Sequence, residues 1–221
     1  MHREVRLFKG ITQPSIFFYQ LTETEKLENF RRKMFLLFFF SCITFGFIAF
    51  FGLGMDSLSK ELTTISPITY ELEKFLFFLG RLLAGLLYAA IILFIPSLIF
   101  WTISDNGEYK KLVMTQGIIL IILLLEKLTY IPLSLFLSLD WHSSPLSLGV
   151  LAQYITSNSL VMYFLGIASI FKVWIFYIQY KGLKSLTQQK NWLVWLVILL
   201  TNLIFWAITA LLAYLNISTL I

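Results

Sequence analysis

The sequence predicts an all-α, polytopic membrane protein: a bundle of five transmembrane helices with its N-terminus inside and its C-terminus outside. Three observations predict this fold class. The chain contains five apolar segments, each close to the roughly 20 residues that a spanning helix requires, and its basic residues fall on alternate connections between them. Of its 221 residues 58% are hydrophobic and only 13% are charged, whereas a soluble domain has about 25% charged residues.

Each of the five predicted spans is predominantly apolar, and the connections on the inner side are shorter than those on the outer side. They run over residues 34–54, 75–101, 112–137, 160–180 and 192–215. Residues 34–221 therefore form one transmembrane domain, preceded by a cytoplasmic amphipathic segment at 1–33. We expect the connection over 55–74 to be a solvated acidic loop, and the stretch 146–155 to form a helix in the outer membrane interface.

The basic residues predict the orientation. If the N-terminus lies inside, the inner connections carry 12 of the 17 Lys and Arg residues, whereas only Lys60 and Lys74 lie on the outer connections. Such an excess of positive charge marks the cytoplasmic side of a membrane protein. Because the basic residues follow the topology and do not form one continuous surface, nucleic acid is not an expected partner.

The N-terminal segment contains a predicted surface helix. Thr22 and Glu25 have the spacing of a capping box, which predicts a short helix that runs to Lys33. Its apolar stripe would lie along the inner membrane surface, and its basic residues would bind anionic lipid headgroups. A specific protein partner is the alternative that the sequence leaves open.

Spans two and three contain the features that bear on helix packing. In span two, the small residues Gly80, Ala84, Gly85 and Ala89 allow backbones to approach closely, so we expect this helix to be central in the bundle. In span three, Pro132 follows two charged residues, so we expect the helix to kink or to end there.

Four polar side chains lie at membrane depth, where a charge is costly unless it faces a partner, an interface or a pathway. At helical rise, Arg81 and Glu126 each lie about 9 Å from the outer face, so we predict an ion pair between spans two and three. Lys172 and Asn202 lie about 12 and 15 Å from the inner face, so we predict a hydrogen bond between them. The alternative is that the charged side chains extend separately toward the interfaces, as we expect of Lys127.

The sequence contains none of the residue sets that catalysis within a membrane requires. His2 and His142 are predicted on opposite sides, Cys42 has no histidine within reach, and Glu126 is the only acidic residue deep in a span. A nucleophile with its base, a carboxylate pair and a metal-ligand set are therefore all missing. We expect a protein that is not an enzyme and that uses no cofactor and no metal.

Several short stretches resemble one known family. Trp174 in span four is followed by Gly182, Leu183 and Thr187 in the turn before span five. Two further stretches agree, one around Pro14 and one that extends from Gly107 through span three to Pro132. In these positions the chain resembles the Yip1 family of five-span integral membrane proteins, in its bacterial form.

The resemblance implies a non-enzymatic protein of the bacterial plasma membrane that acts through other integral membrane proteins. Bacterial members sometimes accompany ABC-type exporters, so the implied role is that of an accessory or scaffold subunit whose partner is such an exporter. The alternative function is a small transporter or channel that uses Arg81, Glu126, Lys172 and Asn202 along its path.

Overall fold

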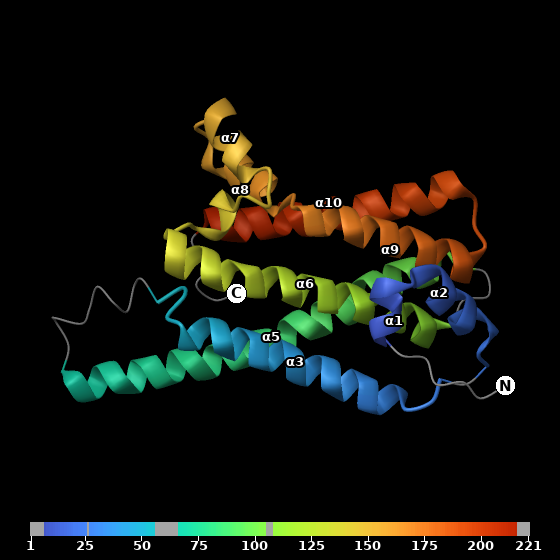
Figure 1. Ribbon diagram of the computed structural model, residues 1–221, viewed down its shortest axis with the longest axis horizontal. Helices are drawn as coiled ribbons and strands as arrows, with labels where there is room; N and C mark the ends of the chain where they lie inside the picture. The colour runs from blue at the N-terminus through green and yellow to red at the C-terminus, as the bar shows by residue number, and fades with distance from the viewer. Residues whose placement is uncertain (1–6, 26, 56–65, 105–107, 216–221) are drawn as a thin grey trace.

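The chain is helical throughout the part that the structure describes, and no β-strand occurs there. This computed structural model describes residues 7–25, 27–55, 66–104 and 108–215. Among these residues four helices are long and apolar enough to cross a membrane: α3 (Phe30–Phe50), α5 (Pro67–Thr102), α6 (Tyr109–Leu137) and α10 (Asn191–Tyr214). The remaining elements are α1 (Leu7–Thr12), α2 (Pro14–Glu23), the 3₁₀-helix η1 (Trp141–Ser143), α7 (Gly149–Ile155), α8 (Ser159–Ile167) and α9 (Ile170–Thr187). Figure 1 shows their arrangement.

The all-α fold class is confirmed, but the fourth predicted span is not one helix. The stretch 160–180 is divided between α8 and α9, which are separated at Ala168 and Ser169. The physical reason is a competing backbone partner. Leu148 N–H donates to Ala168 O at 2.9 Å, and Ile170 N–H donates to Leu146 O at 3.0 Å. These bonds occupy backbone groups that an uninterrupted helix would use for itself.

The centre of the bundle is α6, so the prediction that span two is central was wrong. Residues 111–120 of α6 are all buried, and this helix packs against α1, α3, α5 and α9. The small residues of α5 serve a single close contact, since a Cβ added at Gly85 would lie 2.9 Å from Ser41 O on α3. Small residues allow one neighbouring helix to approach closely on one face. A helix at the centre of a bundle must instead have neighbours on several faces.

The N-terminal helices pack into the bundle, which differs from the predicted surface helix. The predicted helix from Thr22 to Lys33 was wrong, because α2 ends at Glu23 and α3 begins at Phe30. Phe17 and Phe18 on α2 are 1% and 2% exposed. A glycine in α9 makes room for Phe18, since a Cβ added at Gly182 would lie 2.9 Å from the Phe18 ring.

Two segments are helical where we expected an irregular chain. α6 continues through Pro132 to Leu137, so the helix does not end at the proline. α5 begins at Pro67, inside the predicted acidic loop, because Ser66 caps it by accepting from Thr69 N–H and Pro67 occupies its first turn. Residues 56–65 and 105–107, which contain the rest of that loop and most of the next inner turn, lie outside the described residues.

The predicted helix over 146–155 is confirmed for residues 149–155, which form α7. In Figure 1 this helix stands away from the long helices, next to α8. Its position relative to a membrane interface stays a prediction.

The N-terminal part of α5 extends beyond its neighbour. Gly46 on α3 lies against Phe78 and Leu82 of α5, and α3 ends only one turn later, at Phe50. Because the two helices are antiparallel, the first ten or so residues of α5, roughly 15 Å of helix, have no part of α3 beside them. Figure 1 shows this end of α5 projecting past α3.

Candidate functional site

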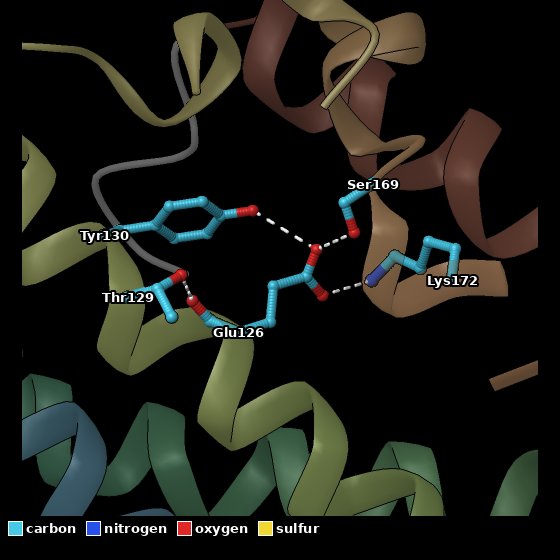
Figure 2. A network of polar contacts seen from close by, with 5 residues as sticks. All are labelled: Glu126, Thr129, Tyr130, Ser169 and Lys172. Carbon is cyan, nitrogen blue, oxygen red and sulfur yellow. Dashed lines mark hydrogen bonds and ion pairs between the residues drawn. The ribbon is translucent and has the colours of Figure 1, made fainter. Parts of the chain in front are cut away.

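A buried ion pair joins α6 to α9 near the break in the fourth predicted span. Glu126 on α6 is 4% exposed, and its Oε2 lies 2.6 Å from Lys172 Nζ on α9. Both side chains are largely shielded from solvent, so the two charges neutralise each other inside the protein. Figure 2 shows the pair and the groups around it.

Two hydroxyl groups complete the coordination of the Glu126 carboxylate. Ser169 Oγ and Tyr130 Oη both donate to Glu126 Oε1, the second at 3.3 Å. A third hydroxyl, Thr129 Oγ1, donates to the Glu126 backbone carbonyl at 2.6 Å. We call these five residues the Glu126 network. Every oxygen of the carboxylate has a donor, as a buried carboxylate requires.

The break between α8 and α9 is what places the donors of the Glu126 network. Ser169 occupies the N-cap position of α9, so its side chain points away from the helix toward α6. Lys172 lies in the first turn of the same helix, where its Nζ reaches the other carboxylate oxygen. The N-terminal end of α9 also carries a partial positive charge that favours a nearby carboxylate.

Both predicted pairs of intramembrane residues were wrong. The ionic partner of Glu126 is Lys172, and no ion pair joins Glu126 to Arg81. The partner of Asn202 is Gln179, whose Oε1 accepts from Asn202 Nδ2 at 2.8 Å.

The error in these pairs has a geometric cause. The predicted span ended at 180, whereas α9 extends to Thr187. Lys172 therefore lies about 22 Å from the inner end of its helix, not 12 Å, and this places it at the level of Glu126. Arg81 does lie near the outer end, but depth alone does not determine which way a side chain points around the helix axis.

A cavity of about 520 Å³ lies beside the Glu126 network, at the end of the bundle where α3 and α10 end. We call it the outer cavity, because it lies at the outer end of the bundle in the orientation predicted from the sequence. Its charged and polar lining comes from α5, α6, η1, α8 and α10, and comprises Arg81, Lys127, Tyr130, Ser134, Asp140, Trp141, His142, Tyr163 and Thr209. Tyr130 belongs to both places, because it donates to Glu126 and also lines the cavity.

Two cations of the outer cavity have no carboxylate partner among the described residues. Arg81 is 8% exposed and its Nε has no hydrogen-bond partner, while its guanidinium lies 5.1 Å from the centre of the Phe77 ring. Lys127 Nζ lies 4.8 Å from the ring centres of both Phe45 and Tyr88. Lys127 therefore contacts aromatic rings within the bundle. Our expectation that its side chain extends separately toward the outer interface was wrong.

The 3₁₀-helix η1 forms an aromatic wall of the cavity. The Trp141 and Tyr163 rings stack at 5.8 Å, and His142 meets Tyr163 edge-on at 5.1 Å. His142 Nδ1 is buried without a hydrogen-bond partner. Burial lowers the pKa of the His142 imidazole below its ordinary value, although the Asp140 carboxylate acts in the opposite direction, so His142 is neutral at pH 7.

The residues that carry the family resemblance occupy mainly packing positions. Pro14 lies at the start of α2, and Pro132 lies within α6. Trp174 is 38% exposed on α9, whereas Leu183 is fully buried. Gly182 gives room to Phe18, as described above, and Thr187 Oγ1 donates to Leu183 O at 2.7 Å at the end of α9.

Several residues of these sites were not predicted from the sequence. Tyr130 lies one helical turn after Glu126, a spacing at which side chains meet, so this contact could have been found. Ser169 and His142 carried no such signal, because the break in the helix and the position of η1 depend on contacts distant in the sequence. Among the described residues no group of His, Cys, Asp and Glu is arranged to hold a metal.

Comparisons with protein families, with curated proteins and with solved structures find no match for this chain. The resemblance to the Yip1 family therefore stays a prediction, and the function must be argued from the geometry.

Proposed function

We propose that this protein is an integral membrane protein of the bacterial plasma membrane that acts as a non-enzymatic accessory or scaffold subunit of another membrane complex. In this proposal the chain crosses the membrane five times, with its N-terminus inside and its C-terminus outside. The long helices α3, α5, α6 and α10 make four crossings, and α9 together with α8 makes the remaining one. An ABC-type exporter is the partner that the family resemblance favours.

The distribution of basic residues supports this orientation. Arg31 and Lys33 lie in the first turn of α3, Lys111 in the first turn of α6, Lys184 in the last turn of α9, and Lys190 directly before α10. These helix ends lie together at the right of Figure 1. One end of the bundle is thus basic, as expected of the cytoplasmic side.

The observation that carries the accessory role is an uncovered apolar stripe on the projecting end of α5. Ile68, Leu72, Phe75 and Leu76 recur at the spacing of one helix face and are 85%, 57%, 58% and 56% exposed. A helix of 36 residues is about 54 Å long, well beyond a hydrocarbon core of about 30 Å. Lipid tails therefore cannot cover the whole of α5, and an apolar helix of a partner protein would fit this stripe.

The internal polar contacts also support this role over the transport alternative. Glu126 and Lys172 bind each other, Asn202 binds Gln179, and Arg81 lines the outer cavity. The four residues thus occupy three separate places. A transport path lined by all four would require them to share one hydrated channel.

The test introduces a charge on the stripe and asks whether the partner is lost. In the Leu72→Glu variant we expect the stable membrane partner that copurifies with the wild-type protein in mild detergent to be lost, because a buried carboxylate without a cation is costly. A photocrosslinking amino acid at position 72 should also join the chain to that partner in intact membranes.

The matched control is Lys74→Glu, which places a glutamate on the opposite face of the same turn and should leave the complex intact. Retention of the same partner by the Leu72→Glu variant would contradict the proposal. So would a wild-type protein that crosslinks from position 72 only to lipid or to a second copy of itself.

A further inference from the structure

We propose that the outer cavity binds a phosphate monoester, whose oxyanion is held by Arg81 and Lys127 and whose organic part lies against the aromatic and aliphatic walls. This inference is independent of docking on α5. It assigns a ligand class to a site whose lining residues come from the six elements α3, α5, α6, η1, α8 and α10 and from the loops beside them.

The first step of the argument is the state of Arg81. Its side chain is more than nine-tenths buried, yet its Nε donates to no described group, and its guanidinium lies over the Phe77 ring, 5.1 Å from the ring centre. A buried cation without an anion is unfavourable, because it loses hydration and gains no ionic partner. Such a residue is stable in this position when a ligand supplies the missing anion.

The second step is the charge that faces the cavity. The Glu126 carboxylate is paired with Lys172 and also attracts the Lys127 ammonium, but it is a single negative charge beside the three cations Lys172, Lys127 and Arg81. Among the described residues that line the cavity, the one carboxylate is that of Asp140, and this residue is exposed. The interior of the cavity therefore has an excess of positive charge, which favours an anion.

The third step is the supply of further hydrogen bonds. The hydroxyl-bearing residues Ser134 and Tyr163 line the cavity, and so does the neutral His142, whose buried Nδ1 has no partner in the described part of the chain. An oxyanion with several oxygens can accept from an arginine, a lysine and hydroxyls at once. Phosphate has this number of oxygens, and a guanidinium fork matches two of them.

The fourth step is size. A cavity of about 520 Å³ falls within the range of roughly 300–1,000 Å³ typical of sites for organic ligands and exceeds the need of a bare ion. The remaining walls are apolar and include Phe45, Ile48 and Leu212. This combination fits a phosphate on an organic body, whether that body is a membrane lipid or a soluble ester.

A glycine makes the approach of Arg81 possible. Gly54 has a φ of +82°, and a Cβ added there would collide with Arg81 Nη2. Gly52, two residues earlier, has a similar φ of +75°, but a Cβ added there would meet nothing within 4 Å. The two positions therefore carry the same backbone strain on substitution by alanine, and only one of them disturbs the arginine.

The experiment measures thermal unfolding of the full chain in mild detergent during titration with three probes. These are dihexanoyl phosphatidic acid, inorganic phosphate and, as the zwitterionic control, dihexanoyl phosphatidylcholine. We expect phosphatidic acid to raise the melting temperature in a saturable manner, and phosphatidylcholine to have no such effect. If inorganic phosphate saturates the shift equally well, the oxyanion site stands and its ligand is a soluble phosphate; a shift confined to phosphatidic acid identifies a lipid headgroup.

The variants connect this binding to named residues. Arg81→Gln and Lys127→Gln should each weaken the apparent Kd by about tenfold or more, and Arg81→Lys should weaken it less because the charge remains. Lys74→Gln, which removes an exposed cation from the same helix, should leave the Kd unchanged. Gly54→Ala should weaken binding, whereas Gly52→Ala should not.

Three results would overturn the proposal: no saturable shift with either phosphate probe, an equal shift with phosphatidylcholine, or unchanged affinity in both Arg81→Gln and Lys127→Gln. If one of these two variants does not fold, the other variant and the Gly54/Gly52 pair still decide the question.

Discussion

The Glu126 network and the outer cavity are adjacent and share Tyr130. They differ in whether their buried cations have a carboxylate partner. In the network, a carboxylate meets a lysine at 2.6 Å and accepts from two hydroxyls. In the cavity, Arg81 and Lys127 lie among aromatic rings without a carboxylate partner in the described residues. The difference indicates that the network holds helices together, whereas the cavity presents two cations to the anionic ligand that we propose.

The largest expected effect follows from breaking the ion pair. Lys172→Met should lower the free energy of unfolding by about 3 kcal/mol or more, because it leaves the Glu126 carboxylate buried without a cation. Denaturant unfolding in mild detergent, followed by circular dichroism, measures this change. The double variant Glu126→Leu with Lys172→Met should recover most of the loss; a double variant as unstable as the single one would show that the pair has no special role.

An intermediate loss of stability is expected when the hydroxyl group of Ser169, at the break between α8 and α9, is removed. Ser169→Ala removes one donor to the buried carboxylate and should lower the free energy of unfolding by about 2 kcal/mol, the range for hydrogen bonds to charged groups. The same unfolding assay applies. Ser185→Ala is the control, since the Ser185 hydroxyl meets only Thr22 at the surface. Equal stability of the two variants would show that the Ser169 hydroxyl does not stabilise the Glu126 carboxylate.

The smallest effect on stability is expected in the cavity. Arg81→Gln removes a buried charge that has no ionic partner, so the unfolding free energy without ligand should stay within about 1 kcal/mol of the wild-type value or rise. If Arg81→Gln lowers the unfolding free energy as much as Lys172→Met does, then Arg81 stabilises the fold. The cavity and the network would then not differ in the way described above.

The local properties of the chain were predictable. Apolar composition and length identified α3, α6 and α10, because the requirement for a spanning helix is itself a matter of composition and length. The early start of α5 was missed although Ser66 and Pro67 carried its signal, because the charged residues that follow were interpreted as a loop.

The break at Ala168 and Ser169 could not be predicted in the same way. The residues from Ile167 to Ile170 contain neither proline nor glycine, and their apolar character fits a continuous helix. The break exists because backbone groups of Leu146 and Leu148 bond to the chain on both sides of it. These hydrogen bonds are tertiary contacts that compete with those of a continuous helix, and no local sequence pattern indicates them.

The sequence by itself determined that this chain forms long apolar helices and that a few charged residues lie within them. Only the tertiary structure decided that Glu126 binds Lys172, 46 residues away, while Arg81 and Lys127 face a cavity. The physical reason is that composition and length are enough to identify an apolar helix. The rotation of each helix and the position of its break, both set by packing, fix which side chains meet.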